Sequence, residues 1–164
     1  MQMKNKSGLS GVVSAMIMIA LVMAAGVIIW VFVNSLIGDR LEETESCYQI
    51  YEKITINNDY TCYDFGEKEV WISIKVGDID VDGILVGVSG EGSSSSFTLL
   101  KDEISITGVN DYSTGSNLVS VPEKNSGKTY VLKFGTLPES IEIAPIVNGK
   151  QCDISDSVYE IYYC

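Results

Sequence analysis

The stretch with the residue types best suited to binding chemistry is residues 78–83, DIDVDG, where Asp78, Asp80 and Asp82 alternate with apolar residues. This spacing matches the opening of a calcium-binding loop, whose carboxylates surround a hard cation. Ser89 occupies the position that would supply the bidentate Glu, and no helical pattern flanks the segment. An extended segment with its three carboxylates facing water explains the same alternation. We prefer this second interpretation, and we expect neither a metal nor another cofactor.

Four cysteines could form covalent bonds or bind a metal, and all of them follow a long N-terminal apolar segment: Cys47, Cys62, Cys152 and Cys164. An even number of cysteines beyond a membrane segment indicates an oxidising exterior and two disulfides. Zinc is the alternative, but the sequence has no C-x-x-C pair. Of the three possible connectivities we favour the local pairs, Cys47–Cys62 and Cys152–Cys164. Each would close a short loop and contribute about 3 kcal/mol in the chain-entropy model.

The rest of the chain offers little for catalysis. It has no histidine, which excludes His-based triads, His general bases and His metal ligands. The carboxylates Glu42, Glu43 and Glu45 follow the apolar segment with no apolar pocket implied around them, so we expect them to be solvated. A net charge of −11 argues against nucleic acid as a partner. We therefore expect a protein that is not an enzyme, and an extracellular hydrolase has little support.

Residues 9–38 carry no charged side chain and are rich in apolar residues. About 30 such residues form a helix of roughly 45 Å, which is longer than the hydrocarbon core of a bilayer. Lys4 and Lys6 precede this segment and a mostly acidic flank follows it. This asymmetry predicts a cytoplasmic N-terminus and an extracellular remainder. A secretory signal cleaved near residues 24–26 is an alternative, but the apolar residues 27–33 would then remain on a soluble protein.

The start of the apolar segment, KSGLSGVV at residues 6–13, resembles the class III leader of archaeal type IV pilins and archaellin-like proteins. In that family a prepilin peptidase cuts after the glycine, which here implies a cut between Gly8 and Leu9. The fifth mature residue would be Val13, where bacterial type IV pilins usually have Glu and archaeal pilins often do not. The resemblance implies that the retained helix first anchors the subunit in the membrane and later forms the core of a helical filament.

Small residues recur along this segment and would allow close approach of neighbouring helices: Gly11, Ser14, Ala15, Ala20, Ala24, Ala25 and Gly26. Gly11 and Ala15 are four residues apart, as are Ala20 and Ala24, so each pair shares one helix face. Small residues are also common in any membrane helix, so this pattern alone does not separate a filament subunit from a simple anchor.

The sequence changes to a period of two after the neck at residues 39–46, and many short strands with Gly, Asn and Asp turns follow. We expect an antiparallel β-sandwich over residues 47–164, of the immunoglobulin-like or jelly-roll-like kind, and hence an α+β chain. Residues 90–96, GEGSSSS, are predicted to be a flexible loop. The predicted strands cover residues 48–56, 70–76, 79–88, 97–100, 104–107, 118–121, 130–134, 141–147 and 158–164.

Two functions remain open from the sequence. The resemblance implies a pilin: a leader at residues 1–8, a helix and neck at residues 9–46, and an outward β domain implicated in adhesion. Its implied partners are copies of itself through residues 9–38, the membrane, a prepilin peptidase, and an assembly ATPase with its membrane platform. The alternative is a single-pass membrane-anchored surface protein that displays a β-sandwich binding domain.

Overall fold

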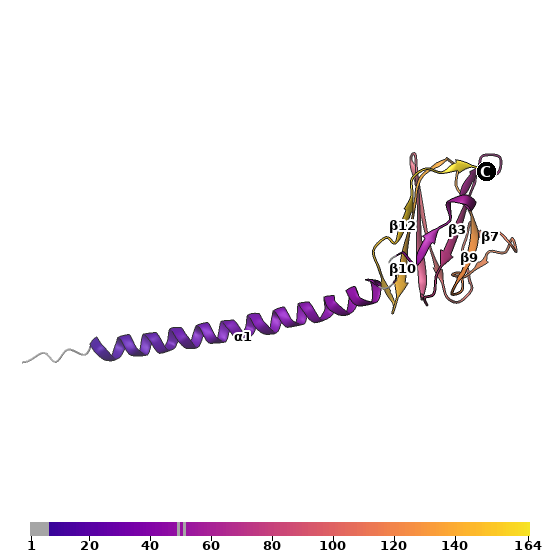
Figure 1. The fold of residues 1–164 in the computed structure, drawn as a ribbon. Helices are drawn as coiled ribbons and strands as arrows, with labels where there is room; N and C mark the ends of the chain where they lie inside the picture. The colour runs from indigo at the N-terminus through magenta and orange to yellow at the C-terminus, as the bar shows by residue number, and fades with distance from the viewer. Residues whose placement is uncertain (1–6, 49, 51) are drawn as a thin grey trace, which may run out of the picture. The chain divides into compact units, whose positions relative to one another are not determined.

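The computed structural model describes the backbone of residues 7–48, 50 and 52–164, and the side chains of residues 11–36, 47, 50 and 52–164. The chain has two compact units, Met1–Glu43 and Thr44–Cys164, which we call the helical unit and the β unit (Figure 1).

The helix α1 (Ser7–Tyr48) is continuous over 42 residues. Its sequence contains no proline, which would remove a backbone hydrogen bond and kink the helix. The helix continues through residues 39–46, as predicted for the neck, and its last turn belongs to the β unit. The predicted strand over residues 48–56 is wrong in its first part, because Tyr48 ends α1 and strand β1 covers only Ile54–Ile56.

The first sheet of the β unit, sheet A, has six strands: β1 (Ile54–Ile56), β2 (Cys62–Asp64), β3 (Glu69–Val76), β7 (Val109–Asp111), β9 (Ser126–Lys133) and β13 (Tyr162–Tyr163). Their order is β13-β2-β3-β9-β7, and β1 also pairs with β3. These pairs are antiparallel except for β13 and β2, which run parallel. The sheet therefore joins the chain's last strand to one of its first.

The second sheet, sheet B, has five strands: β4 (Gly83–Gly90), β5 (Ser93–Leu100), β10 (Pro138–Val147), β11 (Lys150–Gln151) and β12 (Asp156–Val158). All its pairs are antiparallel. The predicted flexible loop at residues 90–96 is wrong, because Ser93 pairs with Gly90 and starts an eight-residue strand along β4. The short strands β6 (Ile104–Ser105) and β8 (Leu118–Val119) form a separate pair.

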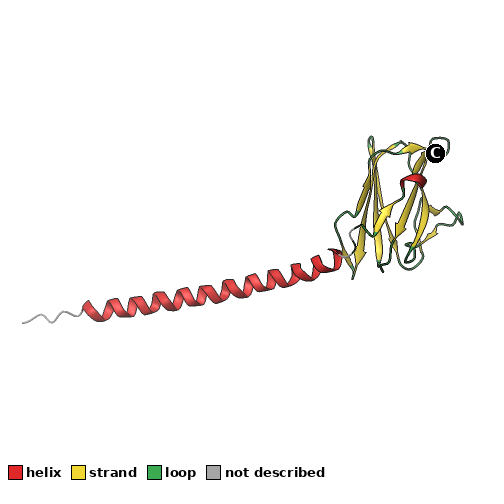
Figure 2. Cartoon of the chain, viewed as in Figure 1, coloured by secondary structure: helices red, strands yellow, loops and turns green. Residues whose placement is uncertain are grey.

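The apolar residues of both sheets meet in one hydrophobic core. Ile72 and Ile74 from sheet A are fully buried, as are Val86 from β4 and Ile143 from β10. Burying one such side chain contributes about 1.5–3 kcal/mol. Figure 2 shows that the β unit consists almost entirely of strands and turns, with the short 3-10 helix η1 (Asn58–Tyr60) between β1 and β2. The chain is therefore α+β, with an N-terminal apolar helix followed by mostly antiparallel sheets.

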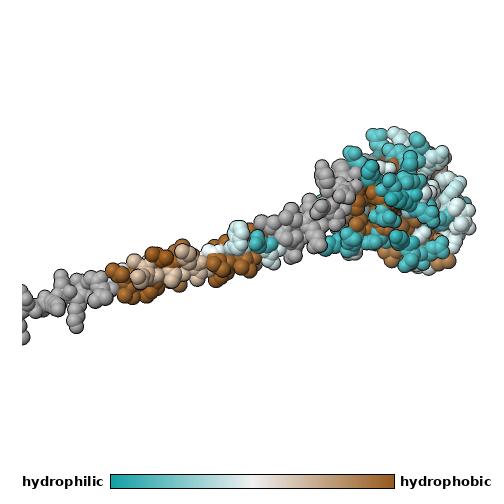
Figure 3. Space-filling view, turned by 60° about the horizontal axis from the view of Figure 1, so that its bottom comes forward, coloured by the Kyte–Doolittle hydropathy of each residue, from teal (hydrophilic) through white to brown (hydrophobic). Residues whose placement is uncertain are grey.

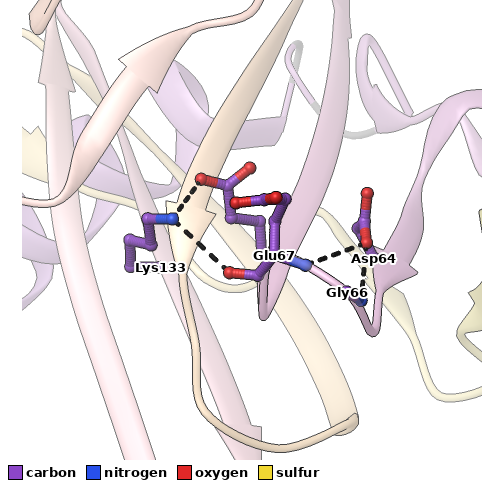
Figure 4. A network of polar contacts seen from close by, with 5 residues as sticks. Asp64, Gly66, Glu67 and Lys133 are labelled. Carbon is purple, nitrogen blue, oxygen red and sulfur yellow. Dashed lines mark hydrogen bonds and ion pairs between the residues drawn. The ribbon is translucent and has the colours of Figure 1, made fainter.

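The turn between β2 and β3 is fixed by polar contacts (Figure 4). Asp64 Oδ1 accepts hydrogen bonds from the backbone N–H groups of Gly66 at 2.8 Å and Glu67 at 3.1 Å. Lys133 on β9 lies 2.7 Å from the Glu69 carboxylate on β3 and also donates to the Glu67 carbonyl. These contacts hold one end of the β3–β9 pair in register.

Candidate assembly helix

The apolar part of α1 exposes every side chain that the structure describes between residues 11 and 36. Gly11–Leu36 is 26 residues long, and it is the helix of the described chain that is long and apolar enough to cross a membrane. Trp30 and Phe32 are 67% and 65% exposed. Figure 3 shows this segment as a largely hydrophobic surface. Such a surface is typical of a membrane anchor or a signal sequence, and the disulfides described below indicate an extracellular β unit.

One face of this helix has a shallow depression around Gly26. The concave patch, which we call the Gly26 patch, is lined by Met18, Ile19, Val22, Met23, Gly26, Val27 and Trp30. Residues 19, 22, 26 and 30 follow one another at helical spacing, so they form a single stripe. A Cβ atom added at Gly26 would meet nothing within 4 Å in the described part of the chain. The missing side chain therefore leaves open space on this face, in which an atom of another molecule fits.

Small residues of the sequence extend the face that carries the Gly26 patch toward the N-terminus. Gly11 and Ala15 lie 11 and 7 residues before Val22 in the chain, which places them on the side of the helix that carries Gly26. Ala20 and Ala24 share another face. The helix thus presents two faces on which its backbone can be approached closely.

The predicted cleavage site lies at the start of α1. Gly8 and Leu9 are in its first turns, where the backbone is helical and the side chains are outside the described part. Residues 1–6 of the predicted leader are also outside the described residues. Cleavage between Gly8 and Leu9 stays a prediction. The side chains of Glu42, Glu43 and Glu45 likewise lie outside the described set.

The predicted disulfide connectivity is wrong. Cys47 pairs with Cys152, with 5.6 Å between their Cα atoms, and Cys62 pairs with Cys164, with 5.1 Å between theirs. The expected local pairs Cys47–Cys62 and Cys152–Cys164 are replaced by bonds that span 105 and 102 residues. The prediction of two disulfides with no free cysteine among the described residues is confirmed.

The parallel pairing of β13 with β2 explains one of these bonds. Tyr162 lies opposite Cys62 in this pair, and the Cys164 N–H donates to the Tyr63 carbonyl at 3.1 Å, which brings the chain end to Cys62. The Cys152 N–H donates to the Pro145 carbonyl at 2.8 Å, which holds Cys152 against sheet B. The sequence gives no local signal of either long-range contact.

The candidate calcium residues have separate protein partners. Asp78 lies 3.1 Å from Lys124 Nζ, Asp80 lies 3.7 Å from Lys101 Nζ, and Asp82 accepts from the Gly149 N–H at 3.0 Å. The hydrogen bond from Lys124, followed by that from Asn125, lowers the pKa of Asp78. The three carboxylates thus face three different partners.

The backbone around these aspartates follows the alternative interpretation in part. Asp78, Asp80 and Asp82 are exposed while Val81 is buried in the core, as expected for alternation. However, β4 begins only at Gly83, so residues 79–82 are an extended loop and not the predicted strand. Within the described part of the chain, no group of three acidic, cysteine or histidine side chains is arranged to hold a metal ion.

A polar groove on the outer face of sheet A was missed by the sequence analysis. It is lined by residues from β1, η1, β3 and β9, together with the turns that flank them. The signal was present in the alternation of β3, where Trp71, Ser73 and Lys75 share the face opposite the core residues Val70, Ile72 and Ile74. This row of side chains becomes part of a groove only because β9 pairs with β3 and places its own side chains beside it, and the sequence does not show that pairing.

Comparison of the chain with known protein families, with curated proteins and with solved structures finds no match.

Proposed function

We propose that this chain is the structural subunit of an archaeal type IV pilus-like surface filament, assembled through α1. The observation that carries the proposal is an apolar helix of 26 residues whose described side chains are all exposed within the helical unit, directly preceded by the leader-like sequence KSGLS. Exposed apolar surface costs about 25 cal/mol per Å² in water, so this helix must be covered by lipid or by copies of itself. In the filament proposal, lipid covers the helix before assembly and copies of the helix cover it afterwards.

The Gly26 patch favours packing of the helix against another helix after assembly. A uniform lipid tail does not require a hollow, whereas a neighbouring helix can place a ridge of side chains into one. The patch is entirely apolar along its stripe, so a second apolar helix fills it without leaving a buried polar group unpaired. The second copy of α1 supplies such a helix with the right length.

In this proposal the N-terminus is cytoplasmic before assembly, and a prepilin peptidase removes residues 1–8. An assembly ATPase and its membrane platform then move the subunit from the membrane into the filament. The β unit, which we propose to be an immunoglobulin-like or jelly-roll-like sandwich, faces outward and contributes to adhesion. Its two disulfides and its acidic composition suit an extracellular position.

A single-pass membrane-anchored surface protein is the second candidate, and the polar groove on sheet A favours it, since a binding surface needs only display. It requires the same anchor but neither leader cleavage nor helix packing. The two candidates therefore differ at residue 8 and at the Gly26 patch.

The first test is the N-terminal sequence of the protein extracted from its native membrane. A start at Leu9 is expected for the pilin. An intact Met1 would favour the plain anchor, and a start after residues 24–26 would identify a secretory signal and contradict both proposals.

The second test measures self-association of the full chain in detergent micelles by energy transfer between labelled copies. Gly26→Leu fills the patch and is expected to lower association by about tenfold, because overpacking typically costs 1–3 kcal/mol. Ile28→Leu is the matched control, since it changes the shape of an exposed helix residue at constant volume. Equal association of the two variants would argue against packing through the Gly26 patch.

A further inference from the structure

The polar groove on sheet A has a floor of short hydroxyl side chains and a rim of longer ones. Thr55 on β1, Ser73 on β3 and Thr129 on β9 form the floor. Lys53, Lys75 and Tyr60 line it as well. We call this set the sheet A groove. Because Ser73 lies opposite Thr129 in the β3–β9 register, the floor crosses neighbouring strands and not a single one.

One wall of the groove is anchored to its floor. The Asn57 N–H donates to the Ser73 carbonyl at 2.8 Å, and the Ser73 N–H donates to Thr61 Oγ1 at 3.1 Å. Thr61 Oγ1 in turn donates to the Asn57 carbonyl at 2.9 Å. These bonds fix η1, which carries Tyr60, against β3. The Tyr60 side chain remains 65% exposed, so its ring is available as a stacking surface on a fixed support.

The end of the groove near Lys53 is equally fixed. The Gly77 N–H donates to the Lys53 carbonyl at 2.8 Å, and the Asn125 N–H donates to the Gly77 carbonyl at 2.9 Å. A Cβ atom at Gly77 would lie 3.3 Å from the Lys53 carbonyl oxygen, so glycine permits this close approach. The backbone that carries Lys53 is therefore positioned before any ligand arrives, which reduces the entropy lost on binding.

The hydroxyl groups of the floor and the two lysines have no protein partner among the described residues, whereas the side chains of Asn57, Asn125 and Ser126 in the lining do. Among the described residues, no hydrogen bond uses the hydroxyl groups of Thr55, Ser73 or Thr129. The three ion pairs of the described chain involve neither Lys53 nor Lys75. The lining itself carries two lysines and one acidic residue, Glu52, on a chain whose net charge is −11. A further carboxylate, Asp78, accepts from the lining residue Asn125 and is paired with Lys124.

Aromatic surface continues beyond the floor. Trp71 is two residues before Ser73 on the same face of β3, and its ring centroid lies 4.7 Å from that of Tyr112. Tyr112 is 54% exposed and its N–H bonds to the Thr129 carbonyl, so the aromatic pair adjoins the hydroxyl floor. The indole N–H of Trp71 is buried and has no partner among the described residues.

We propose that the sheet A groove binds an acidic oligosaccharide, such as a chain of uronic acids. Hydroxyl groups match the many donors and acceptors of a sugar, two ammonium groups match its carboxylates, and Tyr60 offers a ring on which a sugar face can stack. An acidic peptide fits less well, because β3 is already paired on both sides and offers no free backbone edge for an added strand. The groove goes beyond the filament function, and it would bind sugar equally on a single anchored subunit.

The test is calorimetric titration of the full chain in detergent micelles with a guluronate hexasaccharide, with the neutral maltohexaose as the comparison. We expect the acidic sugar to bind at least about tenfold more tightly than the neutral one, and to weaken as salt screens the lysines. Lys53→Ala and Lys75→Ala should each lower affinity by about fivefold to tenfold. Lys101→Ala removes an exposed lysine outside the groove and should leave affinity unchanged.

Three results would overturn the proposal: no binding of the acidic sugar at millimolar concentration, equal binding of both sugars, or equal affinity of the groove and control variants. Binding of a polyglutamate peptide without binding of the sugar would replace carbohydrate by an acidic protein segment and also overturn it. The variants change exposed lysines, so thermal unfolding is expected to match that of the parent chain. None of these outcomes depends on N-terminal cleavage or self-association. A negative result for the sugar would therefore not contradict the filament proposal, and the reverse also holds.

Discussion

Residues 11–36 of α1 and the β unit place their apolar side chains in opposite environments. The β unit buries residues such as Ile72, Ile84 and Ile143 completely, in one core that both of its sheets share. The helix exposes residues of the same type, with Ile28 at 69%. The difference lies in what covers the side chain, because the residue types are alike. The β unit buries its apolar side chains in its own core, whereas the described helix residues leave apolar surface that is unfavourable in water.

Each region also contains one tryptophan, Trp30 in α1 and Trp71 in β3. Single-tryptophan variants therefore report on the two regions separately.

Removal of a disulfide should affect the β unit alone. Cys62→Ser with Cys164→Ser opens a loop of 102 residues and should lower the free energy of unfolding of the β unit by about 2–5 kcal/mol. Helix content in micelles should not change. Urea unfolding of the full chain, followed by Trp71 fluorescence in a Trp30→Phe background, measures the loss. Mass mapping without reduction should recover a Cys62–Cys164 peptide, and a Cys47–Cys62 peptide would contradict the structure.

Truncation of one isoleucine in each region should give different results. Ile143→Ala leaves a cavity in the shared core and should lower the free energy of unfolding of the β unit by about 2–5 kcal/mol. Ile28→Ala removes the same atoms from an exposed helix position and should leave unfolding of the β unit unchanged within about 0.5 kcal/mol. The two variants are compared by the same fluorescence experiment. Similar losses would mean that the helix and the core depend on one another.

The buried carboxylate of Asp111 should make the stability of the β unit depend on pH. Asp111 is 8% exposed, and its Oδ1 accepts from the Ser113 N–H, the Ser113 hydroxyl and the Thr114 N–H. Burial raises the pKa of Asp111, but these hydrogen bonds outweigh it and hold the pKa below its usual value. Its contribution to stability is therefore present above the unfolded pKa of about 3.9 and is lost as pH falls through the lower folded pKa.

Asp111→Ala should therefore lower the free energy of unfolding by about 1–3 kcal/mol at neutral pH, because two backbone N–H groups lose their acceptor. The difference from the parent chain should shrink in strong acid. Urea titrations across the acidic range measure it, with the exposed Asp102→Ala as control. A difference that grows in acid would have the wrong sign.

The smallest effect is expected at Gly26→Ala. The added methyl group meets nothing within 4 Å, and alanine is the better helix former by about 1 kcal/mol. Helix content of the monomer in micelles should be equal or slightly higher by circular dichroism, with no change at Trp71. A loss of helix content would show that Gly26 serves the fold of this chain rather than a contact with another molecule.

Local patterns were enough to predict the elements whose signal is continuous. The apolar run of α1 and the strand at residues 70–76 were placed correctly, because each is set by its own periodicity. Ser93–Ser96 were predicted to be a loop from composition, but pairing with β4 satisfies their backbone groups and makes them a strand. The three-residue strand β7 was not predicted, since its pairing with β9 defines it.

For the site residues too, local features were predicted correctly and long-range contacts were not. The alternation of Asp78, Asp80 and Asp82 was correctly interpreted as three exposed carboxylates, but their lysine partners come from segments distant in the chain. The disulfide partners were predicted wrongly because the sequence does not show that β13 pairs in parallel with β2. The sheet A groove was missed for the same reason: its floor exists only once β1, β3 and β9 are in register.

The two disulfides also have a mechanical consequence. A pulling force that enters the β unit at Cys47 passes directly to Cys152 through a covalent bond, and from there along a short segment to Cys164, which is bonded back to Cys62. The 104 residues between Cys47 and Cys152 would extend to about 350 Å if they were stretched, but the bond between these two cysteines prevents them from being pulled out between those points. Tension that enters at Cys47 would therefore reach Cys152 through the sulfur–sulfur bond without first extending the strands that lie between these two cysteines.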